Sequence, residues 1–70
     1  MKYAVLYEPT ATGYSAHAPD LPGCVAAAAT LDETRRLMKD AIEGHLECIR
    51  QFGYQVPVPT TVVEGIEVHA

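Results

Sequence analysis

Apolar and polar residues alternate in the first part of the chain, as in β-strands. The first expected strand covers residues 2–8. Tyr3, Val5 and Tyr7 share one face of it, and an alanine and a leucine share the other, because successive strand side chains point to opposite faces. Since both faces carry apolar groups, we expect this strand to be central in its sheet or covered on both sides. A polar loop leads to a second strand over residues 14–18.

A stiff connection follows the second strand. Two prolines and a glycine lie within residues 19–24, which excludes a helix or the middle of a ladder because proline lacks the backbone N–H. Asp20 lies before Leu-Pro-Gly, where an aspartate can accept hydrogen bonds from nearby backbone amides. A short third strand is expected over residues 24–28, although alanines 26–29 also suit an early helix start.

The helical pattern begins at Thr30, which can cap the first turn, and predicts a helix from Leu31 to Phe52. Gly53 follows it and suits the left-handed position just beyond a helix end. The apolar stripe of this helix contains eight residues. They are Leu37, Met38, Ala41, Ile42, His45, Leu46, Ile49 and Phe52.

After an extended Val-Pro-Val-Pro segment, residues 60–69 predict a final strand with Val62, Ile66 and Val68 on one face. Glu64 interrupts that face, and a bulge or bend is expected beside it. The expected order is β-β-β-α-β, in a single domain covering residues 1–70.

The chain has 70 residues and a formal net charge of −4. So short a chain buries only about 60% of its unfolded surface, so we expect a homodimer or a higher homo-oligomer. The acidic balance argues against direct nucleic-acid binding, which needs clustered Lys and Arg. The net negative charge is compatible with a basic protein partner, and it is equally typical of a small domain that only needs charge for solubility. No stretch approaches membrane-span length, and we expect a cytoplasmic protein.

Two groups of residues suggest chemistry without establishing it. A thiol, a base and an acid could form a nucleophilic set from His17, Asp20 and Cys24, but a strand histidine, a turn aspartate and a buried cysteine are the favoured explanation. His45 and Cys48 have a zinc-compatible helical spacing and need two further ligands. We therefore predict no catalytic, cofactor-binding or metal-binding residue, and no enzyme.

The chain resembles the N-terminal domain of the HicB family, the antitoxins of HicBA toxin–antitoxin systems. The resemblance covers about residues 1–60. It rests on the tyrosine-rich first strand, the Gly-Tyr-Ser-Ala of residues 13–16, the Ala-Pro-Asp-Leu-Pro-Gly-Cys-Val of residues 18–25 and the Thr-Leu-Asp-Glu of residues 30–33. The motifs of residues 18–25 and 30–33 are specific for the family when they occur together at this separation, whereas either motif alone would be weak evidence.

The resemblance implies an α+β fold, a small antiparallel sheet with one long helix packed on it, similar to a partial ribonuclease-H-like fold. It implies no catalysis. It also implies a HicA-like toxin as partner, a small basic protein that cleaves mRNA and is blocked sterically. We expect the contact surface on the acidic helix face, at Asp40, Glu43 and Glu47. Full antitoxins usually add a C-terminal DNA-binding module, which this sequence does not show, so operator binding is not expected.

Two other functions stay open at this point. The chain could be a solitary, non-catalytic homo-oligomeric binding or structural module with no toxin. It could also be a small thiol enzyme that uses Cys24, which would require an accessible thiolate.

Overall fold

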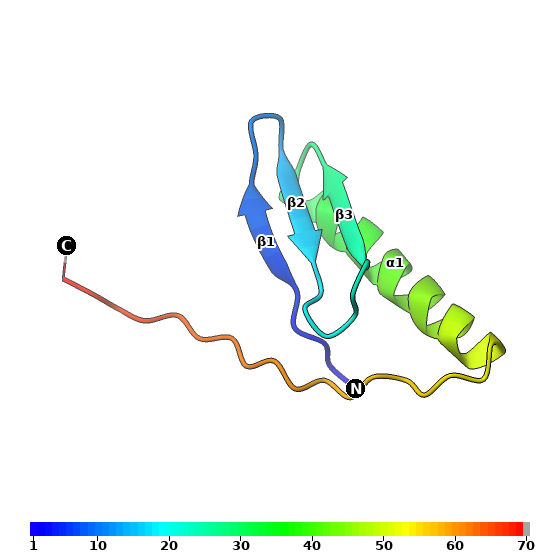
Figure 1. Ribbon diagram of the computed structural model, residues 1–70. Helices are drawn as coiled ribbons and strands as arrows, with labels where there is room; N and C mark the ends of the chain where they lie inside the picture. Colours follow the sequence, from blue (N-terminus) through cyan, green and yellow to red (C-terminus); the bar gives the residue numbers. More distant parts are fainter. Residues whose placement is uncertain (70) are drawn as a thin grey trace.

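Three strands and one helix form the body of the molecule in a computed structural model, which describes residues 1–69. The strands are β1 (Leu6–Pro9), β2 (Tyr14–His17) and β3 (Val25–Ala28), and the helix is α1 (Leu31–Gln51). The sheet is antiparallel in the order β1-β2-β3, and α1 lies across one of its faces (Figure 1). The expected α+β fold, a small sheet with one long helix, is confirmed.

The first strand lies at an edge of the sheet, so the expectation that it would be central is wrong. The central strand is β2, which pairs with β1 on one side and β3 on the other. Strand β1 is also shorter than expected and includes Pro9, whose missing N–H is tolerated at a strand end on an edge. Its second apolar face, which carries Leu6, is only half-buried.

The hairpin between β1 and β2 closes tightly against the end of β3. The Thr10 N–H donates to the Gly13 carbonyl oxygen at 2.8 Å. A Cβ atom added at Gly13 would lie 2.1 Å from the Ala28 carbonyl oxygen and 2.7 Å from the Ala29 Cα. Only glycine therefore allows this approach of the loop to the neighbouring backbone.

The core lies between α1 and the strands β2 and β3. Small side chains on the sheet, such as Ala16, let the helix approach closely, and Met38 fills the space between them at 1% exposure. Leu21 and Cys24, from the connection between β2 and β3, complete the core. Thr34 is fully buried and satisfies its hydroxyl by donating to the Thr30 carbonyl oxygen at 2.8 Å.

Both ends of α1 form as the sequence predicts. The Thr30 hydroxyl accepts the Glu33 N–H at 3.1 Å, which caps the first turn. At the other end Gly53 has φ +72°. The Gly53 N–H donates to Arg50 and the Tyr54 N–H donates to Ile49, the pair of bonds that defines a Schellman motif.

The chain after the helix, residues 52–69, forms no strand among the described residues, so the expected strand over residues 60–69 is wrong for the single chain. This segment runs past the N-terminus and continues beyond β1, away from the sheet (Figure 1). The tail continues away from the sheet and does not follow the unpaired edge of β1, so it gains no strand partner among the described residues. Val62 and Ile66 are 81% and 79% exposed.

The helix α1 carries too many polar residues to cross a bilayer, and no helix among residues 1–69 has the length and apolar character of a membrane span.

Candidate functional site

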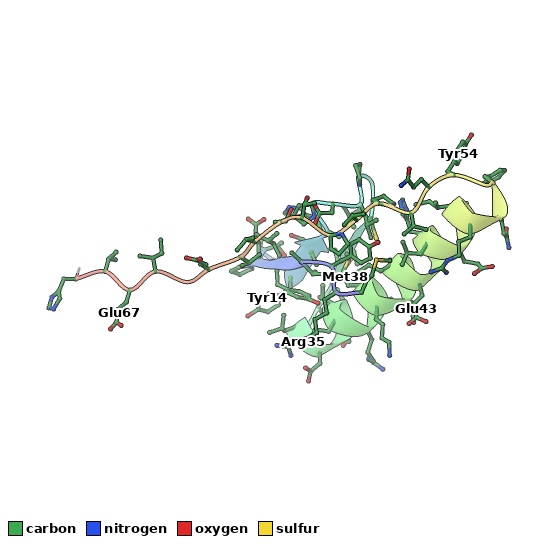
Figure 2. All side chains as sticks on the ribbon, turned by 90° about the horizontal axis from the view of Figure 1, so that it is seen from below. Tyr14, Arg35, Met38, Glu43, Tyr54 and Glu67 are labelled. Carbon is green, nitrogen blue, oxygen red and sulfur yellow. The ribbon has the colours of Figure 1, made fainter. Side chains whose placement is uncertain are left out.

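The acidic residues expected to contact a partner lie together on the exposed surface of α1. Asp40, Glu43 and Glu47 are spaced by three and four residues, which places them on one side of a helix. All three are exposed. Figure 2 shows Glu43 on the solvent side of the helix, whereas Met38 faces the sheet. We call these three residues the acidic stripe.

Neighbouring cations neutralise the acidic stripe only in part. An Arg50 nitrogen lies 3.8 Å from a Glu47 carboxylate oxygen, and both side chains are more than half exposed. An ion pair in this setting is worth little because water screens it, typically about 0–1 kcal/mol. Glu43 and Glu47 also repel each other at their i,i+4 spacing. Arg36 and Lys39 precede Asp40 and Glu43 by one turn, but no ion pair with either acid forms within residues 1–69, so both carboxylates stay available to a basic partner.

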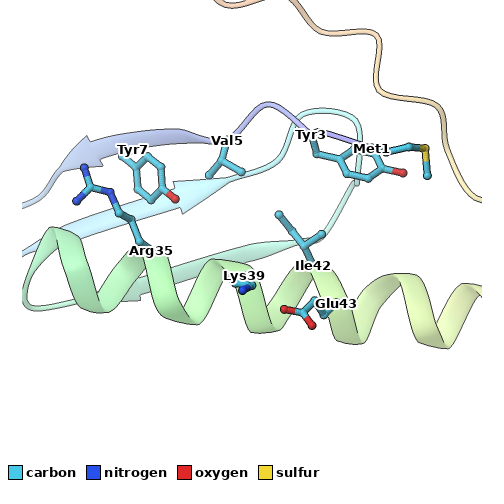
Figure 3. A pocket seen from close by; sticks show the side chains of 8 residues that line it. All are labelled: Met1, Tyr3, Val5, Tyr7, Arg35, Lys39, Ile42 and Glu43. Atoms are coloured by element: carbon cyan, nitrogen blue, oxygen red, sulfur yellow. The ribbon is translucent and has the colours of Figure 1, made fainter.

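An open groove lies beside the acidic stripe, between the segment that contains β1 and the helix, with a volume of about 420 Å³. It exists because α1 packs mainly over β3 and β2, which leaves the helix-facing side of the β1 segment partly uncovered. Its walls combine rings, aliphatic groups and two cations (Figure 3). Tyr3, Val5 and Tyr7 come from one side, and Arg35, Lys39 and Ile42 come from the other, with Glu43 at the rim.

The sequence did not reveal this groove. The alternation of Tyr3, Val5 and Tyr7 showed a shared apolar face, but it could not show how far the helix would cover that face. The signal available was the pair of cations, Arg35 and Lys39, which lie one helical turn apart near the N-terminal half of the helix.

Asp20 is bonded to the C-terminal tail rather than to its own loop. Its carboxylate accepts the backbone N–H groups of Thr60 and Thr61, both at 3.0 Å, and their hydroxyl groups at 3.2 and 2.8 Å. These four bonds, with the Thr61 N–H contributing most, hold the pKa of Asp20 below its ordinary value of 3.8. The local turn explanation of Asp20 was therefore wrong about its partners.

A second contact holds the tail close to the start of the chain. The Tyr3 hydroxyl donates to the Pro57 carbonyl oxygen at 2.5 Å. Together with the bonds of Asp20, this contact fixes residues 57–61 against the body. We call these two contacts the tail clamp.

The structure does not bring His17 and Cys24 together. His17 pairs with Val25 across the strands, so it shares the outer face of the sheet with Val25, whereas Cys24 points to the core. Burial also raises the pKa of the Cys24 thiol, which opposes thiolate formation. On the helix, His45 is half-buried and Cys48 is exposed. Within residues 1–69 no cluster of three or more metal-ligating side chains occurs.

Comparison with known proteins gives one family. The model of the family described as HicB-like antitoxin of bacterial toxin–antitoxin systems matches residues 3–69. An uncharacterised 14.9 kDa protein from the rep-hol intergenic region of Haemophilus phage HP1 is 35% identical over 66 residues, which are 94% of this chain and 50% of the phage protein. A UPF0150 protein of Archaeoglobus fulgidus is 44% identical over 48 residues, 67% of this chain and 70% of that protein. The chain thus spans half the length of its phage relative.

Proposed function

Because the chain belongs to the HicB-like antitoxin family of bacterial toxin–antitoxin systems, we propose that it binds a HicA-type, mRNA-cleaving toxin and blocks it sterically. The observation that carries this proposal is the acidic stripe, an accessible negative surface on a rigid helix. The antitoxin acts by occupying the toxin's surface in the cytoplasm, where the toxin would meet mRNA, and it needs no catalytic group of its own.

Charge complementarity gives the acidic stripe its role. A toxin that binds RNA carries basic side chains on its RNA-binding surface, since phosphates are bound by Lys and Arg. A carboxylate row on a preformed helix can meet that surface with little ordering cost. Such complementarity mainly speeds the encounter and selects the partner. The stripe would therefore compete with RNA for the same cations.

The test is co-expression of this chain with a basic toxin encoded beside its gene, with cell growth as the readout. The wild-type chain is expected to restore growth and to co-purify with the toxin. A variant with a neutral stripe, D40N/E43Q/E47Q, is expected to bind the toxin at least tenfold more weakly and to leave growth arrested. Neutralisation removes the repulsion between Glu43 and Glu47, so the helix itself is not weakened by it.

The matched control removes three carboxylates elsewhere on the surface, in the variant E8Q/E33Q/E67Q, and leaves the ion pair between Asp32 and Arg35 intact. This control has the same net charge as the stripe variant and should neutralise the toxin like wild type. Equal loss of binding in both variants would refute a specific stripe, and growth arrest with the wild-type chain would refute the antitoxin function.

A further inference from the structure

The C-terminal tail leaves the body with its apolar side chains uncovered. Val62, Ile66 and Val68 are between 74% and 81% exposed. They occupy alternate positions with Glu64 between the first two, so an extended tail would present one face made of three aliphatic groups and one carboxylate. We propose that two copies of this chain exchange tails, so that residues 62–69 of each copy lie along the β1 segment in the groove of the other copy.

The groove offers apolar walls and positive charge, which complement the apolar groups and the carboxylate of the tail. Tyr3, Val5, Tyr7 and Ile42 provide apolar walls, and Lys39 and Arg35 lie among them as cations (Figure 3). A tail face of aliphatic groups with one acid therefore meets a groove of apolar groups with two cations and, at its rim, Glu43, which leaves the groove with one net positive charge. Glu64, which interrupts the apolar face in sequence, becomes the residue that selects this groove. Glu67 lies on the opposite face and has no such role.

The edge of the sheet beside the groove is unpaired within residues 1–69. There, strand β1 bonds only to β2, because it is the first strand in the order β1-β2-β3. An exposed edge accepts an additional strand, whose main-chain bonds supply affinity while its side chains fill adjacent pockets. Eight residues of tail span about 26 Å, and the eight residues from 2 to 9 span the same length. The tail can thus cover the whole edge.

The tail clamp directs the tail to a second copy. Tyr3 holds Pro57, and Asp20 holds Thr60 and Thr61. From there the chain continues away from its own sheet, and the molecule measures 48 Å along its longest axis against 26 and 16 Å along the others (Figure 1). The tail therefore extends past its own groove. A chain of this size also buries too little surface alone, which a second copy corrects.

The test uses two charge reversals and light scattering with size-exclusion chromatography on the 70-residue chain. Wild type is expected to be a dimer. E64K and K39E are each expected to raise the dimer dissociation constant at least tenfold, because each places like charges in both grooves. Mixing the two variants in equal amounts should restore a dimer, since each tail then meets a complementary groove in the other copy.

Each charge reversal has a control variant with the same change of charge at a nearby position outside the proposed contact. E67K alters the other face of the tail, and R36E creates the same kind of i,i+4 acidic pair with Asp40 that K39E creates with Glu43. Both controls should dimerise like wild type, and circular dichroism should show that all variants keep the helix. A monomeric wild type would overturn the proposal, as would E64K dimerising as tightly as E67K.

One further outcome separates exchange from docking of the tail on its own chain. If mixing E64K and K39E fails to restore a dimer, the tail does not cross between copies and the proposal is wrong. None of these measurements involves the toxin, so the result is independent of the proposed antitoxin function.

Discussion

Leu21 connects the proline-rich loop to the core, and its truncation is the clearest test of how this fold is held together. Its side chain is fully buried in one cluster with Met38, Ala16 and Ala18. Its backbone also closes the loop, since the Leu21 N–H donates to Ala18 and the Leu21 carbonyl accepts from Cys24, both at 3.0 Å. The substitution Leu21→Ala would remove the side chain and leave these backbone bonds.

The expected loss is large compared with the stability available. Removing a buried leucine side chain costs about 2–5 kcal/mol, because the cavity left behind closes only in part. A chain of 70 residues has a free energy of unfolding of about 3.5–10 kcal/mol. Each kcal/mol lowers the Tm of a domain this size by about 4–8 °C. Even the smallest expected loss therefore lowers the Tm by about 8–16 °C.

The assay is thermal and urea unfolding followed by circular dichroism, at one fixed protein concentration because self-association shifts the midpoint. The control is Leu37→Ala, the same chemical change on a helix residue that is 46% exposed. This control leaves little cavity and should cost much less. If Leu21→Ala lowered the stability no more than Leu37→Ala, the assignment of Leu21 to the core would be refuted.

Two further predictions concern the tail clamp and the hairpin. Because the folded pKa of Asp20 lies below 3.8, its bonds to Thr61 should persist from neutral pH down to about 3.8 and be lost as the pH falls through the lower folded value. The chemical shift of the Thr61 amide in NMR should follow this loss. In the variant Asp20→Asn this amide signal should be shifted at every pH. Gly13→Ala should lower the free energy of unfolding by about 1–3 kcal/mol in a urea titration, because the new Cβ meets backbone at 2.1 Å. Gly44 has open space around it, so Gly44→Ala should raise the free energy of unfolding by up to about 1 kcal/mol in the same titration.

The parts of the fold that depend on neighbours in sequence could be predicted from the sequence. The helix was expected to end at Phe52 and ends at Gln51. Thr30 caps it and Gly53 terminates it as expected, because caps and helix ends involve residues within a few positions of one another. Strand β3 also formed from alanines, since their small size suits the close packing of the helix.

The parts that depend on distant residues could not be predicted. The partner of Asp20 lies forty residues away, and its turn-like surroundings offered a sufficient local explanation. The position of β1 at an edge depended on which strands pair, which a two-sided apolar pattern does not determine. Residues 60–69 have the alternation of a strand, but alternation describes a face to be covered and does not say what covers it.

The tail clamp has a consequence for the order of folding. Contacts among β1, β2, β3 and α1 join neighbours along the chain, whereas the clamp joins residues 54 and 40 positions apart. Closing such long loops costs more entropy than closing the hairpins, so the body can form first and the clamp last. Opening the clamp is then a local event that leaves the body folded. Residues 57–69 can therefore detach from the body and reattach without unfolding it.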